Sequence, residues 1–213
     1  MTIHAYQEIY LESAQANLGD ALDYAVNACH IPGNTFIELF LAGTLCQRME
    51  NGEANYLAGK SGIEIAREIV YETTNKSLTT PPRDDMCRSC EYWIGWAVAY
   101  YQWFTSRKYK DIFAALPYEE LQRLYPTLHE ADITKFVEIA DRQINEMFPE
   151  TNLKRFRTIY GCSQAELAKL SGVSLRSIQM YEQRNKDINK ASAETVLRFS
   201  KALGCRMEDL IQH

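Results

Sequence analysis

The chain has 213 residues and a formal net charge of −5, and 46% of its residues are hydrophobic and 24% are charged. No apolar run approaches the roughly 20 residues that span a bilayer, and the first residues lack the basic and apolar regions of a signal peptide. The six cysteines are too scattered for a dense disulfide framework. These features exclude a membrane-spanning or disulfide-stapled chain, and we expect a cytoplasmic protein with reduced thiols and no membrane partner.

Charge is divided unevenly along the chain. Residues 1–150 carry 12 Lys or Arg and 22 Asp or Glu, a net charge of −10, whereas residues 151–213 carry 11 and 6, a net charge of +5. A basic end suits a polyphosphate partner, and an acidic body either aids solubility or takes part in the choice of partner. The sign changes at residues 148–152, where a proline and polar residues predict a domain boundary.

Residues 1–148 are predicted to form a helical domain of about seven helices, because apolar residues recur three or four apart and no alternating strand pattern occurs. The stretch 77–85 is predicted to be a loop, since two adjacent prolines and short polar residues favour extended conformations. The predicted helices cover residues 5–28, 34–51, 62–73, 86–104, 109–115, 118–124 and 130–147.

The helix predicted over 86–104 is the most aromatic stretch of the chain. Most of its rings have helical spacing, so we interpret it as a central core helix. The alternative is that these rings line a pocket for a small apolar ligand. The aromatic residues are Tyr92, Trp93, Trp96, Tyr100, Tyr101, Trp103 and Phe104.

The most specific motif lies in the C-terminal part, where the pattern predicts two helices joined by a tight turn. Ser163 and Glu166 have the spacing of a capping box at the start of the first helix. Gly172 permits the sharp turn, where a side chain would penalise a positive φ. Ile178 and Tyr181 supply the buried stripe of the second helix. Such a helix-turn-helix commonly places its second helix in the major groove of DNA.

Residues 153–211 resemble the Cro/cI-type helix-turn-helix of phage repressors and of the bacterial xenobiotic-response-element (XRE) family. The resemblance covers about a quarter of the chain and includes all five helices expected of the family. It implies an all-α chain with a DNA-binding domain over 153–213, associated with the bacterial nucleoid. It also implies a homodimer that binds a palindromic, double-stranded operator. The expected helices are 153–160, 163–170, 175–184, 192–203 and 207–211.

By this resemblance, helix 175–184 is the recognition helix, and the positions of Leu175, Arg176 and Met180 are those that usually reach base edges. The same outward face is predicted to carry Gln179. Arg176 is the best direct reader, because a guanidinium can bond the O6 and N7 of guanine together. Gln179 is predicted to pair with adenine or with a phosphate. Leu175 and Met180 are apolar where family members often have polar readers, so they are predicted to contact thymine methyl groups.

The remaining predicted DNA contacts lie around this helix. Gln164 matches a family position that usually holds a phosphate, and its backbone amide gains from the helix dipole. Ser174, which caps the recognition helix, and Ser177 in its first turn are included in the predicted contact surface. Three basic residues in or beside the following loop are predicted to contact the flanking backbone: Arg184, Lys186 and Lys190.

A Cys-x-x-Cys pair, Cys87 and Cys90, admits a zinc or redox interpretation. Structural zinc usually needs a second pair of ligands, which the scattered remaining Cys and His do not offer, so ordinary cysteines at a helix start are favoured. If the pair opens a helix, the helix dipole is expected to lower the thiol pKa, which keeps a redox-sensor role open. No catalytic constellation or phosphate-binding glycine loop is present in the sequence, so we expect no enzyme activity, metal or cofactor.

Two functions are therefore open for the whole chain. The first is a transcriptional regulator, most simply an autoregulatory repressor, whose N-terminal domain dimerises or senses a small-molecule effector. The second is an antitoxin-like protein, whose acidic N-terminal domain neutralises a partner toxin while the C-terminal domain represses the operon.

Overall fold

The computed structural model describes residues 4–83, 88–148 and 150–211. These ranges consist of helices joined by turns and contain no strand, which confirms the all-α prediction. The chain divides between Met147 and Phe148 into two compact units, an N-terminal unit and a C-terminal unit. Within the described ranges, no helix is both long enough and apolar enough to cross a membrane.

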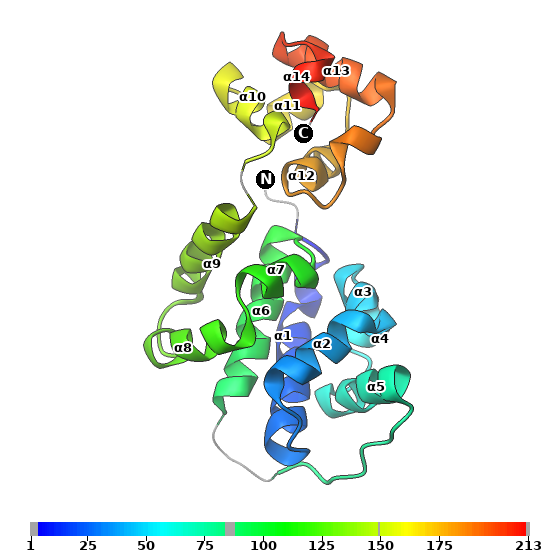
Figure 1. Cartoon of the computed structure of the whole chain (residues 1–213), viewed down its shortest axis with the longest axis vertical. Helices are drawn as coiled ribbons and strands as arrows, with labels where there is room; N and C mark the ends of the chain where they lie inside the picture. The colour runs from blue at the N-terminus through cyan, green and yellow to red at the C-terminus, as the bar shows by residue number, and fades with distance from the viewer. Residues whose placement is uncertain (1–3, 84–87, 149, 212–213) are drawn as a thin grey trace. The chain divides into compact units, whose positions relative to one another are not determined.

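The N-terminal unit is built around two long helices that lie side by side, α1 (Leu11–Asp23) and α6 (Cys90–Thr105) (Figure 1). Helix α5 (Gly62–Thr74) also packs on α1. The other elements are the 3-10 turn η1 (Glu8–Tyr10), the π-helix η2 (Tyr24–Ala28), and the helices α2 (Gly33–Ala42), α3 (Thr44–Glu50), α4 (Ala54–Leu57), α7 (Tyr109–Ala115), α8 (Tyr118–Leu128) and α9 (Ile133–Met147).

Two glycines bring α1 and α6 into backbone contact. A Cβ on Gly95 would lie 2.3 Å from the carbonyl oxygen of Leu18, and a Cβ on Gly19 would lie 2.9 Å from that of Tyr92. The crossing therefore requires that both positions lack a side chain. Helix α6 fulfils the prediction of a central core helix, since five further residues in it are fully excluded from solvent: Ile94, Ala97, Val98, Ala99 and Tyr101.

The helix predicted over 5–28 is interrupted at both ends. It begins with the 3-10 turn η1 and ends in the π-helix η2, where the amide of Cys29 donates to the carbonyl of Tyr24 at 3.0 Å. A bond that spans five residues widens the helix by one residue, and such bulges occur frequently at functional sites. Apolar periodicity alone does not distinguish this ending from a regular helix.

The helix predicted over 34–51 divides at Gly43, which has an extended backbone with φ −82° and ψ 170°. The amide of Thr44 donates to the carboxylate of Glu72 at 3.0 Å instead of to a helical carbonyl. A side chain from α5 thus satisfies the first turn of α3. The break depends on a contact distant in sequence, so the sequence pattern did not reveal it.

The helix predicted over 118–124 continues as α8 to Leu128, through Pro126. A proline has a helical φ and removes only one hydrogen bond of the helix ladder. The amide of His129 still donates to the carbonyl of Tyr125 at 3.0 Å, which closes the last turn. The predicted end of this helix at residue 124 was wrong for this reason.

The C-terminal unit contains the five predicted helices with ends shifted by one or two residues (Figure 1). Helix α12 ends at Glu182 instead of Arg184, because Arg184 has a left-handed backbone with φ 59°. The core residues with the least exposure are Leu167, Ile178, Phe199 and Leu210. The elements are α10 (Asn152–Tyr160), α11 (Gln164–Ser171), α12 (Leu175–Glu182), the 3-10 turn η3 (Ile188–Lys190), α13 (Ala193–Leu203) and α14 (Met207–Leu210).

Candidate DNA-binding surface

Helices α11 and α12 form a helix-turn-helix whose ends are fixed by local hydrogen bonds. The amide of Glu166 donates to Ser163 Oγ at 3.2 Å, and the amide of Ser163 donates to Glu166 Oε2 at 2.7 Å. These bonds confirm the predicted capping box and hold the pKa of Glu166 below its usual value. Gly172 has φ +67°, as the turn requires, and Ser174 Oγ accepts from the amide of Ser177 at 3.2 Å.

The inward face of α12 is broader than the predicted stripe. Ile178 is fully buried, and the ring of Tyr181 meets Phe199 edge-on with centroids 6.0 Å apart. Gln179 and Glu182, which follow each other by one helical turn, are also buried, with 8% and 7% of their surface exposed. Gln179 therefore lies on the inward side of α12 and not, as predicted, on its outward face.

The outward face of α12 begins in its first turn. Arg176 is exposed, and Leu175, Ser177 and Met180 are half-buried. Arg176 precedes Met180 by four residues, so the two side chains lie on one face, away from Ile178. Ser174, just before the helix, is exposed as well, and its hydroxyl lies 2.9 Å from that of Ser177.

A buried ion pair connects α12 to α10. Arg157 donates from Nε to Glu182 Oε1 at 2.6 Å and from Nη2 to Oε2 at 2.9 Å, and the Glu182 side chain is 2% exposed. Arg157 Nη1 also donates to the carbonyl of Cys162 at 2.8 Å. Hydrogen bonding to Glu182 raises the pKa of the Arg157 guanidinium. The pair fixes α12 relative to α10, because a carboxylate this deeply buried needs a charged partner.

The sequence interpretation missed Arg157 and Glu182. The available signal was that Glu182 follows the buried Ile178 by four residues and so falls on the same face. The same carboxylate also accepts from Gln164 Nε2 at 2.7 Å. One of the two amide hydrogens of Gln164 is thus used inside the domain, and the second hydrogen and the backbone amide remain for an external partner.

The loop after α12 carries the predicted phosphate contacts. Arg184 and Lys186 are exposed, and Lys186 Nζ lies 6.0 Å from the centroid of the Tyr181 ring. Lys190, with 85% of its side chain exposed, lies 3.8 Å from Asp187. An ion pair this exposed and this long contributes little to stability, so the lysine is free to exchange partners.

These features define a helix-turn-helix DNA-binding domain. Residues 153–210 match the family model described as helix-turn-helix, and this C-terminal part of the chain is a Cro/cI-type helix-turn-helix domain of the XRE family. This domain supports the function of a DNA-binding transcription regulator of the Cro/cI type. A search of curated proteins and a search of solved structures found no match to the chain.

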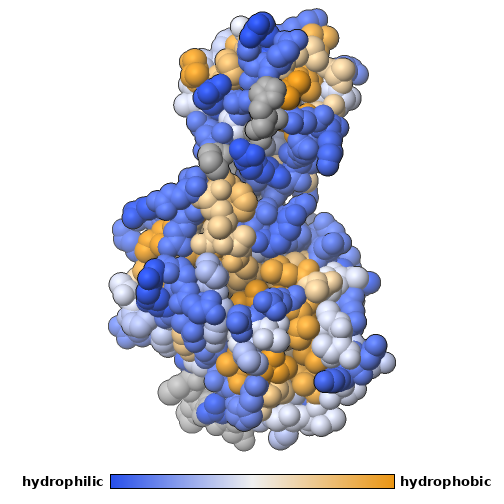
Figure 2. Space-filling view, in the orientation of Figure 1, coloured by the Kyte–Doolittle hydropathy of each residue, from blue (hydrophilic) through white to orange (hydrophobic). Residues whose placement is uncertain are grey.

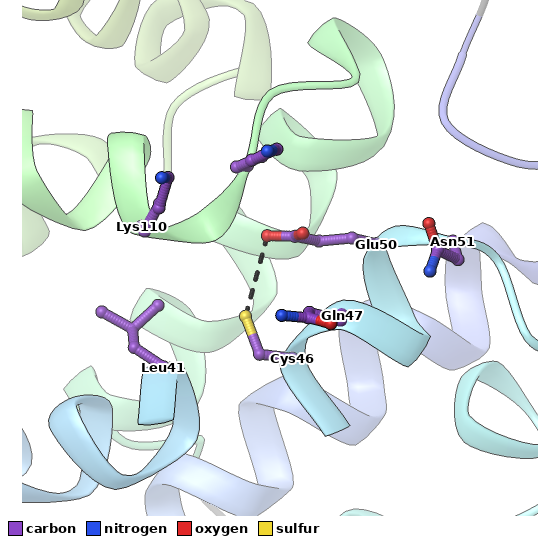
Figure 3. A pocket seen from close by; sticks show the side chains of 7 residues that line it. Leu41, Cys46, Gln47, Glu50, Asn51 and Lys110 are labelled. Carbon is purple, nitrogen blue, oxygen red and sulfur yellow. Dashed lines mark hydrogen bonds between the residues drawn. The ribbon is translucent and has the colours of Figure 1, made fainter. Parts of the chain in front are cut away.

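Two cysteines of the N-terminal unit, Cys46 and Cys90, lie in environments that suppress the thiolate. Cys46 is buried in α3, where its Sγ lies 3.7 Å from Glu50 Oε1 at the edge of a cavity lined also by Gln47 and Lys110 (Figure 3). Burial, and then the Glu50 carboxylate, raises the pKa of the Cys46 thiol well above its usual value. A thiol of this kind is a poor nucleophile.

Of the predicted Cys87–Cys90 pair, the structure describes Cys90, and Cys87 lies outside the described residues. Cys90 is the first residue of α6, as predicted. Its pKa is raised to about 11 by burial and by the neighbouring Glu91, so the expectation of a lowered pKa was wrong. Within the described ranges, no group of three His, Cys, Asp or Glu residues is placed to hold a metal ion.

Proposed function

We propose that the protein is an autoregulatory repressor that binds a two-fold-symmetric operator as a homodimer and reads it with α12. The observation that carries this proposal is the exposed side chain of Arg176, in the first turn of a helix whose opposite face is anchored in the core by Ile178 and Glu182. In helix-turn-helix proteins, the N-terminal residues of the second helix contact base edges.

Specificity is assigned to the outward face of α12. Arg176 bonds the O6 and N7 of a guanine, while Leu175 and Met180 contact thymine methyl groups. The hydroxyls of Ser174 and Ser177 complete this surface at the start of the helix. Gln179 has no part in the readout, because its side chain is buried.

Affinity is assigned to phosphate contacts on either side of α12. Gln164 offers its backbone amide at the start of α11, where the helix dipole favours an anion. The net charge of +5 on residues 151–213 supports the same role. Three exposed basic side chains hold the flanking backbone: Arg184, Lys186 and Lys190.

The test is footprinting on the DNA upstream of the gene that encodes the protein. The wild type is expected to protect two symmetric half-sites about one helical turn apart. Arg176→Ala is expected to cost roughly 1–3 kcal/mol, about 5- to 150-fold in affinity. Arg198→Ala is the matched control, since Arg198 lies on α13 and pairs with Glu194 at 2.6 Å. Equal losses in both variants, or protection unchanged by Arg176→Ala, would contradict the assignment of α12.

An antitoxin-like function is the second candidate, and one feature of the N-terminal unit favours it. Apolar residues gather over the middle of this unit, around α2 (Figure 2). A groove of about 420 Å³ there is lined by Ile37, Leu41 and Phe113, and its charged lining residues are Glu38, Glu119 and Lys110, two acidic and one basic. A net charge of −10 on residues 1–150 suits a basic partner for such a groove.

Co-expression with the product of the neighbouring gene tests this candidate. A basic neighbour that co-purifies in a fixed ratio supports it, provided that Leu41→Glu weakens the complex and Leu197→Glu does not. Leu197 is a suitable control because it is an exposed leucine of the C-terminal unit, 39% accessible. A neighbour that does not co-purify, or a complex indifferent to Leu41→Glu, would exclude the groove as its binding site.

A further inference from the structure

A cavity of about 200 Å³ lies in the N-terminal unit between the first half of α6 and the end of α8. Its walls are mostly aromatic, and they come from elements that are far apart in the sequence. Tyr92, Trp93 and Trp96 belong to α6, and Tyr125 belongs to α8. Helix α6 therefore has two roles: one side of it packs in the core, and Tyr92, Trp93 and Trp96 line the cavity.

The rings of the cavity are held in place by their neighbours. Trp93 meets Tyr125 and Phe136 edge-on, with both pairs of centroids 5.7 Å apart. Tyr125 in turn packs against His129 at 4.6 Å. A cavity of about 150 Å³ with apolar walls accepts a molecule of the size of benzene. The present cavity thus has room for one aromatic ring with a small substituent.

The polar groups of the cavity favour an anion. Arg88 lines it, with the guanidinium 4.6 Å from the centroid of the Tyr92 ring. Its charge also acts on the Asp20 carboxyl: burial raises the pKa of Asp20, and Arg88 opposes that rise. Ser89, which caps the sixteen-residue helix α6, lines the cavity beside it. The partial positive charge of a helix N-terminus adds to that of the arginine.

We propose that this cavity is a binding site for a monocyclic aromatic carboxylate. The ring packs among Trp93, Trp96 and Tyr125, and the carboxylate pairs with the Arg88 guanidinium near the start of α6. Charge-assisted hydrogen bonds of this type are about twice as strong as neutral ones, which makes the carboxylate the selective group. This proposal does not depend on the proposed DNA contacts, because ligand binding is measured on the full chain without DNA.

Titration of the full chain with benzoate tests the proposal by tryptophan fluorescence. Two of the three tryptophans line the cavity, and the third, Trp103, donates to the carbonyl of Tyr6 at 3.0 Å. Benzoate is expected to bind saturably at one site per chain. Benzamide, which has the same shape without the charge, is expected to bind roughly 10-fold more weakly or worse.

Two arginine variants separate the carboxylate contact from general effects of charge. Arg88→Gln is expected to weaken benzoate binding by roughly 10-fold or more. Arg67→Gln is expected to leave it unchanged, since Arg67 lies over a different ring, Tyr24, at 5.6 Å. Absence of saturable binding, equal losses in the two variants, or equal or tighter binding of benzamide or benzylamine would each overturn the proposal. The comparison of the three probes on the wild type does not depend on whether a variant folds.

Discussion

The ion pair between α10 and α12 gives the sharpest prediction for the C-terminal unit. Glu182 accepts three hydrogen bonds, two from Arg157 and one from Gln164, and its side chain is 2% exposed while that of Arg157 is 14% exposed. Glu182→Leu removes the carboxylate and leaves the guanidinium buried without a counter-charge. We expect a loss of about 3–5 kcal/mol, because an unpaired buried charge is strongly destabilising.

The double variant Arg157→Met, Glu182→Leu is expected to recover most of this loss. Replacing both charges with apolar side chains of similar volume removes the cost of desolvation together with the attraction. Glu194→Leu is the matched control in the same unit. Glu194 also pairs with an arginine, Arg198, but its side chain is 71% exposed. An ion pair this exposed contributes less than about 1 kcal/mol.

Native-state hydrogen exchange on the full chain measures these changes within the C-terminal unit. Peptides from α10 to α12 report the free energy of opening there, and peptides from α5 serve as an internal reference. The tryptophans are unsuitable reporters, since all three lie in the N-terminal unit. A Glu182→Leu effect no larger than that of Glu194→Leu, or a double variant as unstable as the single one, would refute the role given to the pair.

Gly95→Ala is expected to destabilise the N-terminal unit by roughly 1–3 kcal/mol, because the added Cβ would lie 2.3 Å from a backbone oxygen of α1. Thermal denaturation followed by tryptophan fluorescence measures this, and an unchanged midpoint would contradict the close helix crossing. Alkylation of Cys90 by iodoacetamide is expected to rise about tenfold per pH unit between pH 8 and pH 10, because only the thiolate reacts and burial raises its pKa to about 11. Mass spectrometry of the Cys90 peptide gives the rate, and a plateau below pH 9 would contradict that environment. Lys190→Ala is expected to weaken binding to all duplexes alike and to reduce the salt dependence by about one unit of slope. A loss confined to one DNA sequence in band-shift assays would exclude a backbone contact.

The parts of the structure that the sequence predicted depend on short-range rules. The capping box of Ser163 and Glu166 and the positive φ of Gly172 follow from residues within a few positions of each other. The five helices of the C-terminal unit were predicted from the resemblance to the Cro/cI-type domain, with errors of one or two residues at their ends.

The errors arose where a distant residue decides the local environment. Gln179 was assigned to the outward face, but the buried face of α12 also includes Gln179 and Glu182. Glu182 can be buried because Arg157, from another helix, pairs with it. The break at Gly43 likewise depends on Glu72, a side chain of α5. The sequence left open whether the aromatic residues of α6 form core or line a pocket. The cavity beside α6 could not be predicted, because Tyr125, which forms part of its wall, comes from the distant helix α8.

The central claim is that the outward face of α12 sets the DNA sequence preference. Selection of bound duplexes from a random pool, with the wild type and with Arg176→Ala, tests it most directly. The account predicts a two-fold-symmetric wild-type motif and, in the variant, lost preference for one guanine in each half-site while the other positions persist. A motif that is the same in both proteins would contradict the claim.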